Sequence, residues 1–135
     1  MELRYLYLGT SDTERDLVAW LAVPGAELRW RFQRFGADVA CVDTGSGPAV
    51  MLADHRPAGS VLPIYAVAGL EEAVAFDEHG WTLVEQGVEV PEGPVALLRS
   101  ADGIELALLR VDRPEAMENA FRDRSNTFAV HPPDP

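Results

Sequence analysis

Few residues in this 135-residue chain are of the types that commonly do chemistry. Its three histidines, His55, His79 and His131, lie far apart in the sequence and predict no shared metal site. The single cysteine, Cys41, allows neither an intramolecular disulfide nor a cysteine metal cluster. Cys41 lies in an alternating, strand-like segment, which favours a small buried side chain over a catalytic thiol. Motifs for a nucleophilic serine or a phosphate-binding glycine loop are absent.

The charge balance excludes some partners. The chain has 22 acidic and 11 basic residues and a net charge of −11, and every basic residue is an arginine. Because phosphate recognition needs clustered positive charge, we expect neither a nucleic acid nor an anionic membrane surface as a partner. The only basic cluster is Arg29, Arg31 and Arg34, which we expect on a solvated strand face. No apolar run approaches about 18 residues and no signal-peptide pattern is present, so we expect a cytoplasmic protein.

Two similar series of elements must position any site, and each consists of a strand, a helix and three strands. In the first series, alternation and turn residues predict strands at 3–8, 27–35, 38–43 and 49–53. In the second series, they predict strands at 61–67, 81–85, 95–99 and 104–109. Pro63 lacks an amide hydrogen, so we expect its strand at a sheet edge or a bulge.

A helix follows the first strand of each series. Residues 11–14 have the Ser-x-x-Glu form of a capping box, and apolar residues then recur at helical spacing as far as Pro24-Gly25. The second helix begins near Gly69 and ends at His79-Gly80, since a glycine just beyond the last turn commonly stops a helix. The polar segment after residue 112 allows a short helix around 114–121.

The repeated βαβββ order, with a period of about 55 residues, indicates an internal duplication. Together with four segments, this order resembles the vicinal oxygen chelate superfamily, which includes glyoxalase I, extradiol dioxygenases, and fosfomycin and bleomycin resistance proteins. The segments that carry the resemblance are 5–12, 67–74, His79-Gly80 and 101–106. Ala101 replaces the proline that is common in the last of them.

The resemblance covers residues 1–113 and implies a single domain with an α+β fold. Two βαβββ modules, at 1–57 and 58–113, would form an eight-stranded, cup-shaped mixed sheet with helices outside. The resemblance also implies a ligand cavity inside the cup and, as in many members, a homodimer. Residues 114–135 would form a C-terminal tail.

Catalytic members of the superfamily hold a divalent metal, which acts as a Lewis acid, on inward-facing His, Glu or Gln residues of the first and last strand of each module. The resemblance places Tyr5, Met51, Leu62 and Ala107 at those positions. None is an ordinary ligand for a divalent ion, and the phenol pKa near 10 makes Tyr5 a poor one. Glu105 shares a strand face with Ala107 and is the one charged candidate for the cup, but it would stand alone. We therefore expect no metal and no other cofactor.

The cup would instead be lined by aromatic and apolar side chains. Tyr5 and Tyr7 share one face of their strand, and Trp30 and Phe32 share one face of the next. Such a lining suits a flat apolar ligand, although the same side chains could simply fill a core. The candidate ligand-binding residues are Tyr5, Tyr7, Trp30, Phe32, Met51, Leu62, Glu105 and Ala107.

Three functions stay open. We favour a non-enzymatic binding protein of the bleomycin-resistance type, which sequesters an aromatic or cationic small molecule in the cup. The second is a metal-dependent glyoxalase-like lyase or dioxygenase, whose metal ligands lie at residues other than those counted above. The third is a degenerate module that serves regulation or assembly and binds no ligand.

Overall fold

The computed structural model describes residues 1–34 and 36–121, which form eight strands and three helices. The strands of the first module are β1 (Glu2–Gly9), β2 (Glu27–Arg34), β3 (Ala37–Asp43) and β4 (Ala49–Ala53). Those of the second module are β5 (Val61–Val67), β6 (Thr82–Val90), β7 (Gly93–Arg99) and β8 (Glu105–Arg110). The helices are α1 (Thr13–Leu21), α2 (Glu71–Glu78) and α3 (Ala116–Phe121). No helix in the described part of the chain is long and apolar enough to cross a membrane.

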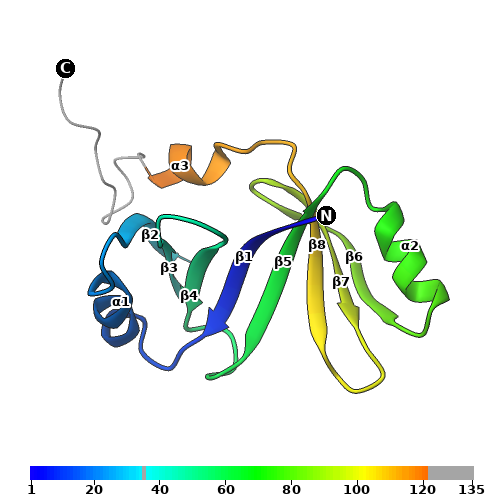
Figure 1. The fold of residues 1–135 in the computed structure, drawn as a ribbon, viewed down its shortest axis with the longest axis horizontal. Coiled ribbons are helices and arrows are strands. Elements are labelled where there is room, and N and C mark those ends of the chain that lie inside the picture. Colours follow the sequence, from blue (N-terminus) through cyan, green and yellow to red (C-terminus); the bar gives the residue numbers. More distant parts are fainter. Residues whose placement is uncertain (35, 122–135) are drawn as a thin grey trace.

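The eight strands form one mixed sheet in the order β2-β3-β4-β1-β5-β8-β7-β6 (Figure 1). Within each module, the first strand pairs in parallel with the last, as β1 with β4 and β5 with β8. The two modules meet where β1 and β5 pair antiparallel in the middle of the sheet. This architecture confirms the predicted α+β fold and its βαβββ duplication.

Alternation along the strands separates the two faces of the sheet. On one face, Leu17 of α1 packs against the β3 and β4 side chains Ala40, Val42, Val50 and Leu52. On the same face of the other module, Ala73 of α2 packs among Val67, Ala96, Leu98, Leu106 and Leu108. The alternate residues of β4 and β8 therefore face away from α1 and α2, toward the other side of the sheet.

The third helix lies on that other side. Met117 of α3 packs into a cluster with Tyr5, Trp30 and Met51, which belong to β1, β2 and β4. Figure 1 shows α3 above the ends of the first-module strands, whereas α1 and α2 flank the sheet. The two module helices thus lie outside the cup as expected, and the short helix expected around 114–121 is α3, which lies on the opposite side of the sheet. His131 lies outside the described residues.

Two local predictions are corrected by the structure. Asp12, and not Ser11, caps α1, because the Asp12 carboxylate accepts a hydrogen bond from the Arg15 amide at 3.0 Å. The strand that contains Pro63 is not an edge, because β5 lies between β1 and β8. Pairing with β8 begins only at Ile64, so the missing amide hydrogen of Pro63 removes no bond on that side.

The expectation of a solvated face for the basic cluster is wrong for Arg31. Its side chain is buried and forms ion pairs with Glu14 of α1 at 2.6 Å and with Asp38 of β3 at 2.8 Å. Arg31 lies on the sheet face that α1 covers. Its side chain therefore points toward a helix and not into water. Its guanidinium lowers the pKa of the Asp38 carboxyl below the ordinary value. Arg29 is also paired, with Glu118 of α3.

Candidate ligand-binding cavity

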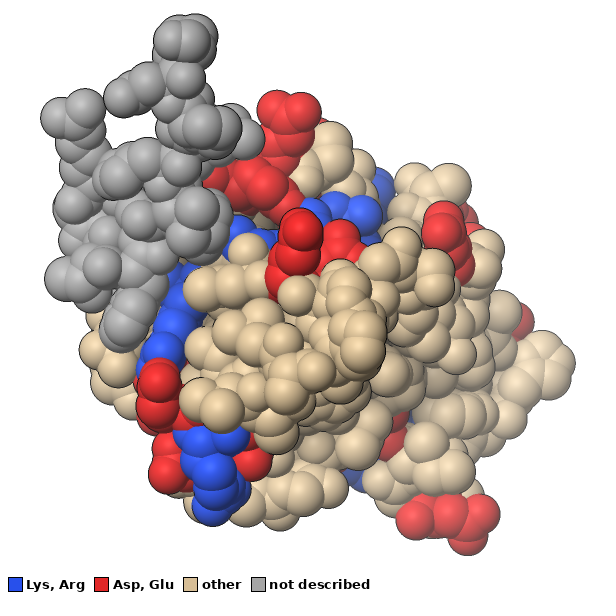
Figure 2. Space-filling model, turned by 60° about the vertical axis from the view of Figure 1, so that its left-hand side comes forward, with Lys and Arg blue, Asp and Glu red and all other residues tan. Residues whose placement is uncertain are grey.

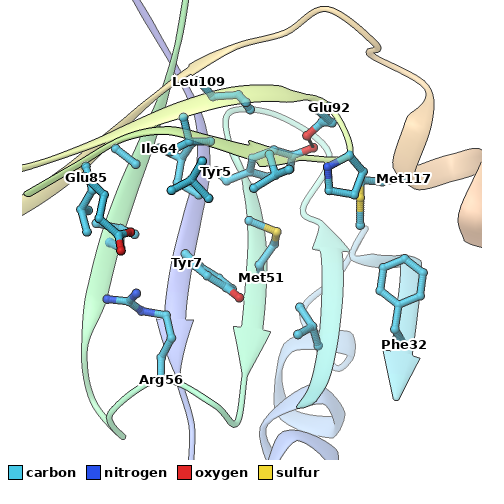
Figure 3. Close-up of a pocket in the computed structure, with 18 of the residues that line it drawn as sticks. Tyr5, Tyr7, Phe32, Met51, Arg56, Ile64, Glu85, Glu92, Leu109 and Met117 are labelled. Carbon is cyan, nitrogen blue, oxygen red and sulfur yellow. Dashed lines mark hydrogen bonds between the residues drawn. The ribbon is translucent and has the colours of Figure 1, made fainter. Parts of the chain in front are cut away.

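The face of the sheet opposite α1 and α2 encloses a cavity of about 350 Å³. All eight strands contribute side chains to its wall, which is possible only because the sheet is strongly curved. The loop after β4, the β6–β7 turn and α3 complete the lining (Figure 3). A volume of this size lies within the range of small-molecule sites, which are about 300–1,000 Å³.

The structure brings together most of the residues that the sequence nominated. The cavity wall includes Tyr5, Tyr7, Trp30, Phe32, Met51, Leu62 and Ala107. Glu105 does not line it: this residue begins β8, and its carboxylate lies 3.6 Å from the guanidinium of Arg99. That any of these residues binds a ligand stays a prediction.

Trp30 belongs both to the core and to the cavity wall. Its side chain is 1% exposed, and its ring lies against Phe32 with the ring centroids 5.1 Å apart. The core and ligand-binding interpretations of this residue therefore do not exclude each other. Its indole Nε1 is buried and has no hydrogen-bond partner.

The cavity has a polar group at the end near α3, where Glu92 enters from the β6–β7 turn (Figure 3). Glu92 is 4% exposed, and its carboxylate accepts hydrogen bonds from the Tyr5 hydroxyl at 2.7 Å and from Arg4 Nε at 3.2 Å. Burial, and then the Glu92 carboxylate, raise the pKa of Tyr5 above its ordinary value. Gly93 permits this placement, because a Cβ there would collide with the carbonyl oxygen of Arg110.

A second polar group lies beside Tyr7, on the loop between β4 and β5. The guanidinium of Arg56 lies 5.5 Å from the centroid of the Tyr7 ring, and the Tyr7 hydroxyl forms a 2.8 Å hydrogen bond with His55 Nε2. Burial raises the pKa of Tyr7 to about 12, against the opposing effect of Arg56. Figure 3 shows Arg56 and Glu85 reaching toward each other across this part of the cavity.

No family model and no curated protein matches this sequence. Similar solved structures do exist. The hypothetical protein BH1468 from Bacillus halodurans C-125 has a TM-score of 0.68 at 15% identity, over 83% of this chain and 95% of that one. Methylmalonyl-CoA epimerase from Mycobacterium tuberculosis has a TM-score of 0.68 at 14% identity, over 85% and 91%.

A methylmalonyl-CoA epimerase in complex with methylmalonyl-CoA and NH4+ has a TM-score of 0.65 at 12% identity, over 82% of this chain and 94% of that one. These epimerases belong to the vicinal oxygen chelate superfamily. The chain has the vicinal oxygen chelate fold. At these identities the comparison shows the fold alone, so the ligand must be argued from the residues of the cavity.

The four residues that the resemblance places at metal positions offer no ordinary donor for a divalent ion. Tyr5, Met51, Leu62 and Ala107 supply a protonated phenol, a thioether and two aliphatic groups. If Glu105 took the last-strand position in place of Ala107, it would still supply no ligand, because its carboxylate lies outside the cavity wall. Within residues 1–34 and 36–121, no three His, Cys, Asp or Glu side chains come together as a metal site would require.

The cysteine and the described histidines likewise form no reactive group. Cys41 is fully buried, which confirms its predicted role, and burial raises its pKa to about 12. His55 is hydrogen-bonded to Tyr7, whereas His79 lies at the end of α2 with Nδ1 2.7 Å from the carbonyl oxygen of Ala75. The two histidines belong to different modules and share no partner.

Three charged residues of the cavity were not predicted from the sequence: Arg56, Glu85 and Glu92. The sixth strand was expected to end at residue 85, whereas β6 continues to Val90. Extending the alternation through Val88 and Val90 would have placed the β6–β7 hairpin over the cup. No sequence signal separated Arg56 from the other arginines.

The surface differs from the cavity in its charge. On the face shown in Figure 2, uncharged residues occupy the middle, and acidic and basic side chains lie toward the edges. Most of the described aspartates and glutamates are exposed, so the surplus of carboxylates is mainly a surface property, while the cavity wall is mostly apolar and aromatic.

Proposed function

We propose that this protein binds a flat, aromatic small molecule in its cavity and does not transform it chemically. The observation that carries this proposal is the lining at the four metal positions of the fold. Tyr5, Met51, Leu62 and Ala107 provide apolar contact there instead of metal ligands, and Trp30 and Phe32 add aromatic surface. Aromatic side chains favour stacking on a planar partner.

Between the aromatic and cationic ligands expected from the sequence, the cavity supports the aromatic one. Glu92 already accepts hydrogen bonds from Tyr5 and Arg4, so its negative charge is largely satisfied within the protein. Glu85 is exposed to solvent, which weakens its attraction for a cation. Sequestration of a toxic compound, as in bleomycin-resistance proteins, is the cellular role that we propose, with a homodimer as the proposed assembly.

Tryptophan fluorescence tests this proposal, because the three tryptophans occupy different environments. Trp30 lines the cavity, whereas Trp20 of α1 and Trp81, just after α2, pack in the clusters on the opposite face of the sheet. Titration with a panel of planar aromatic compounds should quench the fluorescence of the wild type and of Trp20→Phe. The Trp30→Phe variant should show little or no change. A panel without a single saturable response would overturn the proposal and favour a module without a ligand.

Metal binding tests the enzymatic alternative. We expect Mn²⁺, Ni²⁺ and Zn²⁺ to leave the melting temperature unchanged, because the four positions lack suitable donors. Stoichiometric metal in the purified protein, with clear stabilisation, would instead favour a lyase or dioxygenase.

A further inference from the structure

Arg56 differs from the other arginines whose side chains the structure describes. Each of those arginines has a carboxylate within ion-pair distance: Arg4, Arg15, Arg29, Arg31, Arg99, Arg110 and Arg113. Arg56 has no ion-pair partner among the described residues, although the chain carries 22 acidic residues against 11 basic ones. A cation left unpaired in so acidic a protein needs an explanation.

The position of Arg56 supplies one. Its side chain lines the apolar cavity, and its Nε is buried without a hydrogen-bond partner. The protein covers this atom, so a ligand would meet the two terminal nitrogens of the guanidinium, which have no carboxylate within ion-pair distance among the described residues. The ring of Tyr7, 5.5 Å from the guanidinium carbon, holds the group against the wall and limits the freedom it would lose on binding.

We propose that Arg56 anchors the negatively charged group of the ligand, so that the ligand is an aromatic carboxylic acid. This inference rests on the proposed function and specifies its ligand class. The planar guanidinium fork matches a carboxylate with two parallel hydrogen bonds, and the aromatic body of the ligand would occupy the apolar remainder of the cavity.

Arg56 also bears on the cationic ligand that the acidic composition suggested. A guanidinium group only donates hydrogen bonds and repels an ammonium group, which also only donates. The charge of Arg56 in the lining therefore favours an anion over that cation.

The Glu85 carboxylate would repel a bound anion, and this repulsion gives a second test of the proposal. Its carboxylate lines the cavity and extends toward Arg56 in Figure 3, but it forms no ion pair with it. A bound carboxylate would lie between the attraction of Arg56 and the repulsion of Glu85. Neutralising Glu85 should therefore strengthen the binding of an acid, whereas a merely apolar ligand would be indifferent to it.

A matched set of naphthalene compounds separates charge from shape. We would measure the binding of 2-naphthoate, 2-naphthamide and 2-naphthylmethylammonium by calorimetry and tryptophan quenching. The wild type should bind naphthoate at least about 10-fold more tightly than the neutral amide, as expected for a charge-assisted hydrogen bond. Arg56→Gln should weaken naphthoate about 10- to 100-fold and leave the amide unchanged, and Glu85→Gln should tighten naphthoate only slightly, because Glu85 is exposed and water screens its charge.

The control variant is Arg99→Gln, which removes the same charge outside the cavity and should not alter affinity. Circular dichroism would show that each variant is folded. Equal binding of naphthoate and naphthamide, or an Arg56→Gln variant that keeps the preference, would overturn the inference while leaving the proposed function intact. Tightest binding of the ammonium would also overturn it. If none of these compounds and nothing in the aromatic panel binds, the proposed function itself fails.

Discussion

The replacement Glu92→Leu removes the acceptor that two donors share at the α3 end of the cavity. The buried carboxylate accepts hydrogen bonds from the Tyr5 hydroxyl at 2.7 Å and from Arg4 Nε at 3.2 Å. Leucine has a similar size but no acceptor, so both donors lose their partner. The backbone carbonyl of Glu92 still accepts from the amides of Asp112 and Arg113, so the turn itself is preserved.

We expect this change to lower the free energy of unfolding by about 3 kcal/mol. The Tyr5 hydroxyl is buried, and an unsatisfied buried donor costs about 1–3 kcal/mol. The Arg4 side chain is 27% exposed, so water replaces part of its ion pair and about 1 kcal/mol remains from that partner. The total lies at the lower end of the range of about 3–5 kcal/mol for breaking a buried pair.

Urea unfolding followed by fluorescence measures this loss. Tyr5→Phe alone should cost about 1 kcal/mol, and Glu92→Gln, which keeps an acceptor, should cost less than Glu92→Leu. The double variant Tyr5→Phe/Glu92→Leu leaves no orphaned hydroxyl, so its loss should fall short of the sum of the single losses by about 1–2 kcal/mol. Strictly additive losses would refute the coupling. A loss below about 1 kcal/mol for Glu92→Leu would show that water satisfies both donors.

Three further predictions concern other titratable groups. Asp38→Asn should cost about 2–3 kcal/mol at pH 7 because Arg31 loses its bidentate partner. Since Arg31 lowers the pKa of Asp38, the stability that this carboxylate contributes is present above its unfolded pKa near 3.9 and is lost as the pH falls through the folded pKa. Urea titrations of the wild type and the variant should therefore converge in acid. Tyr7, with a pKa of about 12, contributes stability that is present below its unfolded pKa near 10 and is lost as the pH rises through 12; Tyr7→Phe should reduce that alkaline loss in thermal melts. Cys41 is buried and its pKa is about 12, so a thiol reagent should label it only at the rate of unfolding, and labelling of the native protein within seconds would contradict this.

The element order could be predicted from sequence because strand alternation and helical spacing are local properties. The bounds of β4 and β5 agree with those expected, and so does the end of α2 at His79. Errors arose where tertiary packing decides. Arg31 alternates like a surface residue, yet α1 covers it, and Pro63 suggests an edge, yet β5 lies in the middle of the sheet.

The cavity was predictable in its apolar part and not in its charged part. Alternation shows that Tyr5 and Tyr7, and likewise Trp30 and Phe32, share a strand face, and the resemblance implies that these faces line the cup. Glu92 could not be nominated in this way, because its burial depends on contacts with Tyr5 and Arg4, which are remote in the sequence. Nothing local distinguishes it among 22 acidic residues.

The duplicated βαβββ order, the two outer helices and the lack of metal-binding residue types at the expected positions follow from the amino-acid sequence. The element order depends on residue type and spacing along the chain, whereas the outer helices and the metal positions are what the resemblance to the vicinal oxygen chelate superfamily implies. Which charges are satisfied depends instead on the folded arrangement, which buries Glu92 against Arg4 and Tyr5 and leaves Arg56 without a described carboxylate partner beside an apolar cavity. Electrostatic partnership depends on distances between remote residues, and those distances are set only once the strands have assembled into the curved sheet.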